Sequence, residues 1–139
     1  ILIRDAQRFD VIVTTNMFGD ILSDEASELS GSLGLAGALN AGADYAVAQA
    51  QHGSAPDIAG RDRANPISLV LSSAMLLDWL GARHRNNALG NAAAAINRAV
   101  DQALADPATR TSDIGGALGT ARFGEVVAQT VINQAARAG

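Results

Sequence analysis

The sequence predicts an α/β fold that is rich in helix and contains few strands. Of its residues 48% are hydrophobic but only 4% are aromatic, and alanine is abundant, so the core is expected to consist of helices packed through small side chains. Two runs, 9–15 and 43–51, are the strand candidates, because the first is apolar and β-branched and the second partly alternates. A length of 139 residues suits one domain with a sizeable core.

The first half of the chain is predicted to pass from a buried strand into a helix. The strand covers residues 9–15, and from residue 17 to about residue 33 apolar side chains recur with helical period along one stripe. Gly31, Gly34 and Gly37 then interrupt the helix. A loop rich in Gly and Pro follows the second strand.

Three helices are predicted in the second half of the chain. Their ranges are 67–80, 87–106 and 120–136. Asn65 is placed to cap the first, with Pro66 at its first position and Gly81 just beyond its last turn. Pro107 stops the second helix, and Thr120 is placed to cap the third.

Two strands cannot form a well-covered parallel sheet, which normally has more strands and helices on both faces. We therefore expect the missing strands to come from an upstream part of the same polypeptide or from a partner chain. The chain also opens at Ile1 without an initiator methionine, which is typical of a piece of a longer polypeptide.

Composition excludes several classes of function. The net charge of −4 and pI near 4.9 have the wrong sign for a nucleic-acid partner. All ten cationic residues are arginine and there is no cysteine, so lysine chemistry, disulfides and thiolate metal sites are excluded. No apolar run is long enough for a membrane span and no signal peptide is evident, so we expect a cytoplasmic protein without a membrane partner.

Asp20 and Asp24 are candidate metal ligands. They stand four residues apart in a predicted helix, so both carboxylates lie on one face and can reach a single hard cation such as Mg²⁺ or Mn²⁺. The alternative is that these acids complement the helix dipole and face solvent.

The loop at 52–60 is a candidate nucleotide site. It follows a predicted strand and precedes a capped helix, so backbone N–H groups, the His52 imidazole and the Asp57 carboxylate can converge there. The imidazole can lie against an adenine ring, and Asp57 can accept a hydrogen bond from a ribose hydroxyl while repelling a 2′-phosphate. The alternative is a surface turn that happens to contain a histidine.

Four motifs taken in order resemble the C-terminal part of the isocitrate/isopropylmalate dehydrogenase family. They are Asn-Met-Phe-Gly-Asp-Ile-Leu-Ser-Asp at 16–24, Gly-Ser-Leu-Gly-Leu at 31–35, His-Gly-Ser-Ala-Pro-Asp-Ile-Ala-Gly at 52–60 and Ala-Asn-Pro at 64–66. The resemblance covers nearly the whole chain. It is nearest to the NAD-using 3-isopropylmalate and tartrate dehydrogenase branches.

The resemblance implies a set of binding residues. Asp20 and Asp24 correspond to metal-binding aspartates of the family for Mg²⁺ or Mn²⁺. The residues that match its adenosine-binding loop are His52, Gly53, Ser54, Ala55, Asp57, Ile58 and Asn65. Asp57 followed by Ile58 favours NAD over NADP. The family's catalytic tyrosine, lysine and substrate-binding arginines lie upstream of the matched segment, so no catalytic residue is assigned in this chain.

The resemblance also implies an architecture and an activity. Residues 1–37 correspond to the end of the small domain and residues 38–139 to the C-terminal part of the large domain of a homodimeric enzyme. The expected reaction is oxidative decarboxylation of a small 2-hydroxy dicarboxylic acid, foremost 3-isopropylmalate. Tartrate or D-malate dehydrogenase is an alternative, and so is a non-catalytic assembly or regulatory module, which Gln49 favours because relatives commonly have glutamate there. The 139-residue chain alone is expected to be inactive.

Overall fold

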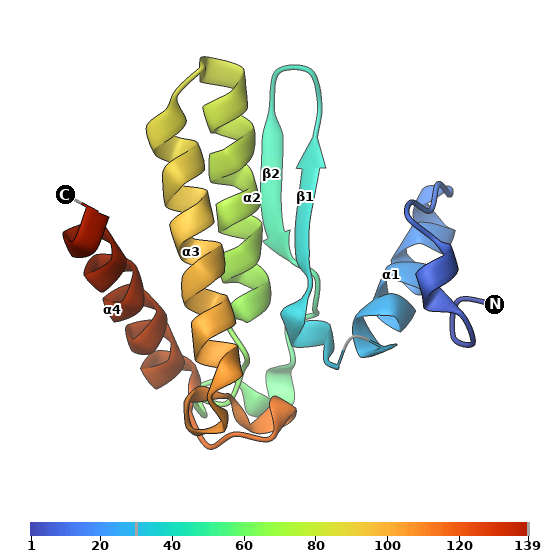
Figure 1. Ribbon diagram of the computed structural model, residues 1–139. Helices are drawn as coiled ribbons and strands as arrows, with labels where there is room; N and C mark the ends of the chain where they lie inside the picture. The colour runs from blue at the N-terminus through green and yellow to red at the C-terminus, as the bar shows by residue number, and fades with distance from the viewer. Residues whose placement is uncertain (30, 139) are drawn as a thin grey trace.

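The computed structural model describes residues 1–29 and 31–138, apart from the side chains of residues 33 and 138. Its regular elements are α1 (Asn16–Leu29), β1 (Gly37–Ala41), β2 (Ala46–Ala50), α2 (Ile67–His84), α3 (Asn87–Ala105) and α4 (Thr120–Ala138). Figure 1 shows the β1–β2 hairpin, α2, α3 and α4 side by side, with α1 and the N-terminal residues set apart from them. The predicted helix-rich α/β class is confirmed.

Packing between helices forms the core. Its buried side chains come from α2, α3 and α4 and are Ile67, Ala99, Val100, Ala103, Phe123 and Val127. Phe123 is the largest of them and is fully buried. From α3 the small side chains of Ala93, Ala99 and Ala103 are buried, which agrees with the expectation that the helices pack through small side chains. None of the helices in the described residues is long and apolar enough to span a membrane.

Two helix ends that were predicted from glycines lie elsewhere in the structure. The first helix ends at Leu29, before Gly31, whose φ of +126° is not helical. Gly81 lies inside α2 and does not end it, and the helix continues to His84. A Cβ on Gly81 would lie 3.0 Å from the backbone nitrogen of Gly90, so this glycine serves the close approach of α2 and α3.

The predicted strand at 9–15 is wrong. Residues 11–15 have no regular structure, and the side chains of Val11 and Val13 are 80% and 93% exposed. A strand requires a neighbour for its backbone hydrogen bonds, and within the described residues β1 and β2 form the only ladder. The β-branched run therefore has the composition of a strand, but the described part of the chain provides no neighbouring strand with which it pairs.

The sheet is antiparallel, which corrects the expected parallel arrangement. β1 pairs with β2 from Gly37 opposite Ala50 to Ala41 opposite Ala46. β1 was not predicted because its Gly-Ala-Leu-Asn-Ala composition is poor in β-formers. Residues 43–51 were predicted as a strand, and β2, Ala46–Ala50, lies within that range.

Two buried serines connect α2 to the hairpin. Ser72 Oγ accepts a hydrogen bond from the Ala38 amide at 2.9 Å, and its hydroxyl shares its proton between the Gln49 carbonyl and the Ser68 carbonyl, both at 2.7 Å. One turn earlier, Ser68 Oγ accepts from the Gln51 amide at 2.9 Å and donates to the Ala36 carbonyl. Both hydroxyls are fully buried, so α2 fixes the end of the hairpin from which the loop at 52–60 departs.

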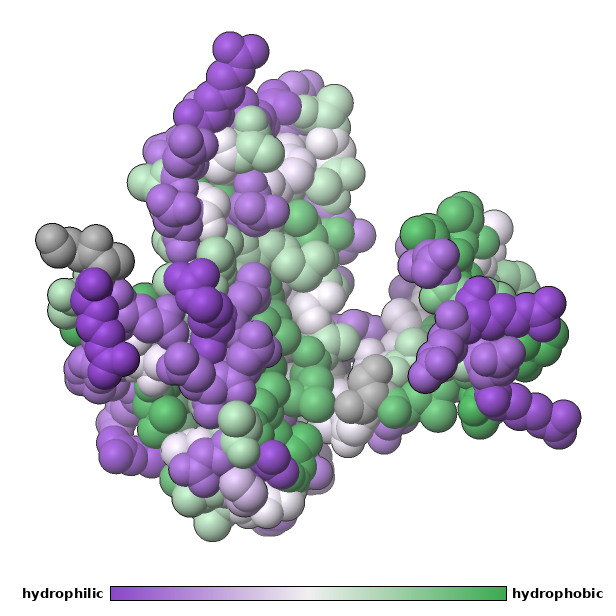
Figure 2. Space-filling model, in the orientation of Figure 1, coloured by the Kyte–Doolittle hydropathy of each residue, from purple (hydrophilic) through white to green (hydrophobic). Residues whose placement is uncertain are grey.

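The apolar stripe of α1 is largely exposed. Met17, Phe18 and Ile21 are 63%, 55% and 60% exposed, and Figure 2 shows a cluster of hydrophobic residues on this separate part of the molecule. The apolar residues therefore do form a stripe along the helix, as their spacing predicted, but the described part of the chain leaves most of that stripe uncovered.

Replacing Ser72 by alanine is expected to lower the free energy of unfolding by about 1–3 kcal/mol, because the Ala38 amide and Gln49 carbonyl lose a buried partner. Ser73→Ala is the control, since Ser73 is exposed and its hydroxyl bonds only to the Leu69 carbonyl of its own helix. Urea unfolding monitored by circular dichroism measures both. Equal stabilities of the two variants would contradict the role given to Ser72.

Candidate functional site

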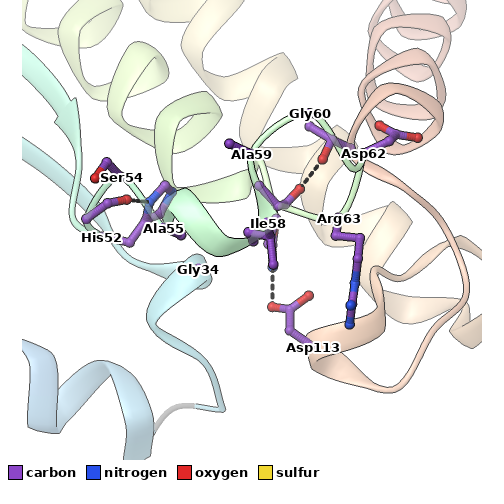
Figure 3. Close-up of a pocket in the computed structure, with 14 residues that line it drawn as sticks. Gly34, His52, Ser54, Ala55, Ile58, Ala59, Gly60, Asp62, Arg63 and Asp113 are labelled. Atoms are coloured by element: carbon purple, nitrogen blue, oxygen red, sulfur yellow. Dashed lines mark hydrogen bonds between the residues drawn. The ribbon is translucent and has the colours of Figure 1, made fainter.

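The loop predicted to bind a nucleotide borders a pocket of about 640 Å³. Six of the seven predicted adenosine-binding residues line it: His52, Gly53, Ser54, Ala55, Ile58 and Asn65. Asp57 is the exception, because it is exposed and lies outside the lining. The volume falls in the range of small-molecule sites. Figure 3 shows the loop curving above Asp113.

Local backbone geometry gives the loop its curved path. Ala55 adopts a left-handed conformation with φ of +40°, and a single 3₁₀ turn, Pro56–Ile58, follows it. Gly60 has φ of +73° and open space where a side chain would stand. Gly53 likewise has nothing within 4 Å of a Cβ position, so a ligand can approach the backbone there.

The His52 ring is oriented by its neighbour. Its Nδ1 lies 3.0 Å from the carbonyl oxygen of Gly53. A hydrogen bond to a carbonyl requires the proton on Nδ1, which leaves Nε2 of the neutral ring as an acceptor. His52 is exposed, so its ring is accessible from the pocket.

Asn65 connects the pocket to α2. Its Oδ1 accepts from the Ile67 amide at 3.0 Å, so Asn65 bonds to the start of α2 as expected of a cap, although the helix begins at Ile67 and its N-cap position is Pro66, one residue later than predicted. Its Nδ2 donates to Oδ2 of Asp113 at 2.9 Å. The amide group therefore has one orientation. Gly34 packs against it, because a Cβ on Gly34 would lie 2.9 Å from Asn65 Cβ.

Asp113 lines the pocket but was not among the predicted site residues. Its carboxylate also accepts a hydrogen bond from Ser32 Oγ at 3.0 Å, so it connects three segments that are distant in sequence. Desolvation would raise the pKa of Asp113, but the side chains of Thr111, Asn65 and Ser32 together lower it below its usual value. No local pattern in the Gly-rich loop at 111–119 points to this contact.

The cap of α4 comes from Asp62, in the segment between the loop at 52–60 and α2, which corrects the prediction for Thr120. Asp62 Oδ1 accepts from the Ala121 amide at 2.8 Å, and the Asp62 carbonyl accepts from the Thr120 amide at 3.2 Å. The Thr120 hydroxyl donates to the Ala64 carbonyl instead of capping its own helix. Both Asp62 and Thr120 line the pocket.

Asp20 and Asp24 lie away from this pocket. Both are exposed on α1, which Figure 1 shows apart from the hairpin and α2. Two carboxylates one helical turn apart suit Mg²⁺ or Mn²⁺ as part of a ligand set. Among the residues that the structure describes, no group of three or more metal-ligating side chains occurs, so further ligands would have to come from outside them.

Comparison with known proteins gives a consistent result. The family model described as isocitrate/isopropylmalate dehydrogenase matches residues 1–127. The chain is 48% identical over 126 residues to a homoisocitrate dehydrogenase of Methanocaldococcus jannaschii, covering 91% of this chain and 34% of that protein. It is 47% identical over 139 residues to a 3-isopropylmalate dehydrogenase of Hahella chejuensis, covering 96% and 36%. The chain thus spans about a third of the length of these relatives.

A solved structure shares the arrangement as well. The crystal structure of isocitrate dehydrogenase from Methylococcus capsulatus superposes with a TM-score of 0.86 at 42% identity, covering 94% of this chain and 37% of that chain. At this identity the likeness extends beyond the fold class to the sequence of the matched elements.

Replacing Asp113 by asparagine is expected to lower the free energy of unfolding at pH 7 by about 1 kcal/mol or less, because the carboxylate is partly solvated. The folded pKa is depressed, so the contribution is present above the ordinary aspartate pKa of about 4 and is lost as the pH falls through the folded value. The difference between wild type and variant should shrink below pH 4. Urea unfolding at pH 3 and pH 7 measures it, with Asp101→Asn, at an exposed position of α3, as control. A difference that does not change with pH would contradict the assignment.

Proposed function

Because the chain belongs to the isocitrate/isopropylmalate dehydrogenase family, we infer that it is the C-terminal part of an NAD- and Mg²⁺- or Mn²⁺-dependent oxidoreductase. The reaction is oxidative decarboxylation of a small 2-hydroxy dicarboxylic acid. One observation carries this proposal: six of seven residues proposed for adenosine binding line a single pocket.

The pocket suits an adenosine group. Ala55 and Ile58 offer apolar surface, and the exposed His52 ring can lie against the flat face of a base. Asn65 and Asp113 add polar groups at one end of the same pocket. A mostly apolar cavity with a few oriented polar groups is typical of nucleotide sites.

Asp57 is proposed to select NAD over NADP. It lies outside the pocket lining, in the exposed turn Pro56–Ile58 directly beside it. A carboxylate there can meet the ribose, which projects from an adenine held in the pocket, and can repel a 2′-phosphate.

Asp20 and Asp24 are proposed to contribute two carboxylates to the metal site. When bound, the cation would promote ionisation of the substrate hydroxyl and stabilise the enolate left by loss of CO₂. The contribution of this chain is the pair of oxygen ligands, held one turn apart by α1. The remaining ligands and the catalytic residues belong to the other two thirds of the length found in relatives.

The acid that is oxidised is proposed to be 3-isopropylmalate. Homoisocitrate is a second candidate, because the relative named for it is as similar as the one named for 3-isopropylmalate, with 48% and 47% identity. Tartrate and D-malate stay alternatives, as does a module without catalysis. Turnover of the complete polypeptide on each acid distinguishes them, and no turnover of any would favour the module.

The domain division and assembly are part of the same proposal. Residues 1–37 would complete a small domain and residues 38–139 a large domain of a cytoplasmic homodimer. The exposed apolar side chains of Met17, Phe18 and Ile21 support this, because such a stripe is normally covered.

Asp20→Asn and Asp24→Asn are each expected to weaken Mn²⁺ binding by about tenfold or more, because each removes a charged ligand. Glu28→Gln is the matched control, since it removes the same charge from an exposed position one turn further along α1. Calorimetric titration of the complete polypeptide with Mn²⁺ measures the affinities. An equal loss in all three variants would show a general charge effect and not ligation.

Asp57→Lys is expected to shift the ratio of NAD to NADP affinity toward NADP by about tenfold, because it exchanges a repelling charge for an attracting one. The measurement is fluorescence titration of the complete polypeptide with NADH and NADPH. Asp101→Lys on α3 makes the same change of charge away from the pocket and should leave the ratio unchanged. An unaltered ratio in Asp57→Lys would remove Asp57 from the site, and failure of the wild type to bind NADH would overturn the proposed function.

A further inference from the structure

The start of α4 forms part of the pocket wall. Thr120, its first residue, lines the pocket together with Asp62, Arg63 and Ala64 of the preceding loop. The two segments are nearly sixty residues apart in sequence. The wall of the pocket is therefore built from two distant pieces of chain, and its shape depends on how they are joined.

Three hydrogen bonds make this junction. The Thr120 and Ala121 amides donate to the carbonyl and the carboxylate of Asp62, at 3.2 and 2.8 Å, and the Thr120 hydroxyl donates to the Ala64 carbonyl. The first four amides of a helix have no partner within the helix, and the positive end of its dipole attracts a carboxylate. Asp62 thus supplies acceptors for two amides at the start of α4 that have none within the helix.

The junction leaves no spare room. A Cβ on Gly119 would lie 2.2 Å from Oδ2 and 2.6 Å from the carbonyl oxygen of Asp62. Asp62 itself has φ of +53°, a left-handed conformation that Asp, Asn and Gly tolerate best. Both the backbone of Asp62 and the glycine opposite it are therefore required for the carboxylate to reach the helix.

We propose that Asp62 is a positioning residue that couples α4 to the nucleotide pocket. Its carboxylate holds residues 62–64 against the start of α4, so the pocket has its binding shape only while α4 is docked. This inference rests on the proposed function, that the pocket binds the adenosine part of NAD. Coupling is reciprocal, so NAD must in turn stabilise the junction.

The test is a set of single variants in the complete polypeptide. Asp62→Gly removes the carboxylate and keeps the left-handed backbone accessible, and Asp62→Asn keeps an acceptor oxygen. Asn86→Ala is the matched control, because it removes the side chain that caps α3 through the Ala88 amide and lies outside the pocket lining. NADH affinity is measured by titration, and hydrogen exchange at the Ala121 amide is measured with and without NADH.

Asp62→Gly is expected to weaken NADH binding about fivefold, the factor that corresponds to loss of one cap. Asp62→Asn should restore most of the affinity, and Asn86→Ala should leave it unchanged although it destabilises the protein. In the wild type NADH should slow exchange at Ala121, and in Asp62→Gly it should not.

Two results would overturn the proposal in distinguishable ways. If the wild type binds NADH but Asp62→Gly binds it equally well, the coupling is wrong and the proposed function stands. If the wild type does not bind NADH, both are wrong. A loss in Asn86→Ala as large as in Asp62→Gly would assign the effect to general stability and would also overturn the coupling.

Discussion

The hydrogen bonds of the Ser68 and Ser72 hydroxyls fix the point at which the loop that borders the pocket leaves the hairpin. They bond α2 to backbone groups on both sides of the hairpin, so the last residue before the loop, Gln51, has a fixed position. The other end of the loop reaches Asn65, whose side chain caps the same helix. Both ends are therefore anchored to the first two turns of α2, and between them Asp62 and Ala64 are also bonded to the start of α4.

Local signals in the sequence predicted α2, α3 and α4 because these helices carry their information within themselves. Asn65 stands where a cap is needed and Pro107 where a helix must stop. The run at 9–15 also has a strong local signal, but a strand is completed by a neighbour that no local pattern reports. β1 is the opposite case. Its residues are poor β-formers, so no local pattern predicts a strand, and its pairing with β2 decides its conformation.

The residues of the candidate site also divide into those that a local pattern predicts and those that it does not. Its histidine loop is contiguous, so this motif alone points to half of the lining residues, and six of the seven predicted binding residues line the pocket. Asp62 and Asp113 reach it through contacts that span about 48 to 81 residues of sequence. Nothing in the sequence around these two aspartates distinguishes them from acids that make no contact within the chain, and only the folded chain shows which amides and hydroxyls they meet.

The buried hydroxyls on α2 also restrict the register of the helix relative to the strands. Apolar side chains can slide past one another at small cost, whereas a hydroxyl that is one residue out of register points about a hundred degrees away from its partners. A displaced helix would leave four backbone groups without acceptors or donors in a dry interface. The polar contacts thus select a single alignment of α2 on the hairpin, where apolar residues alone would permit several.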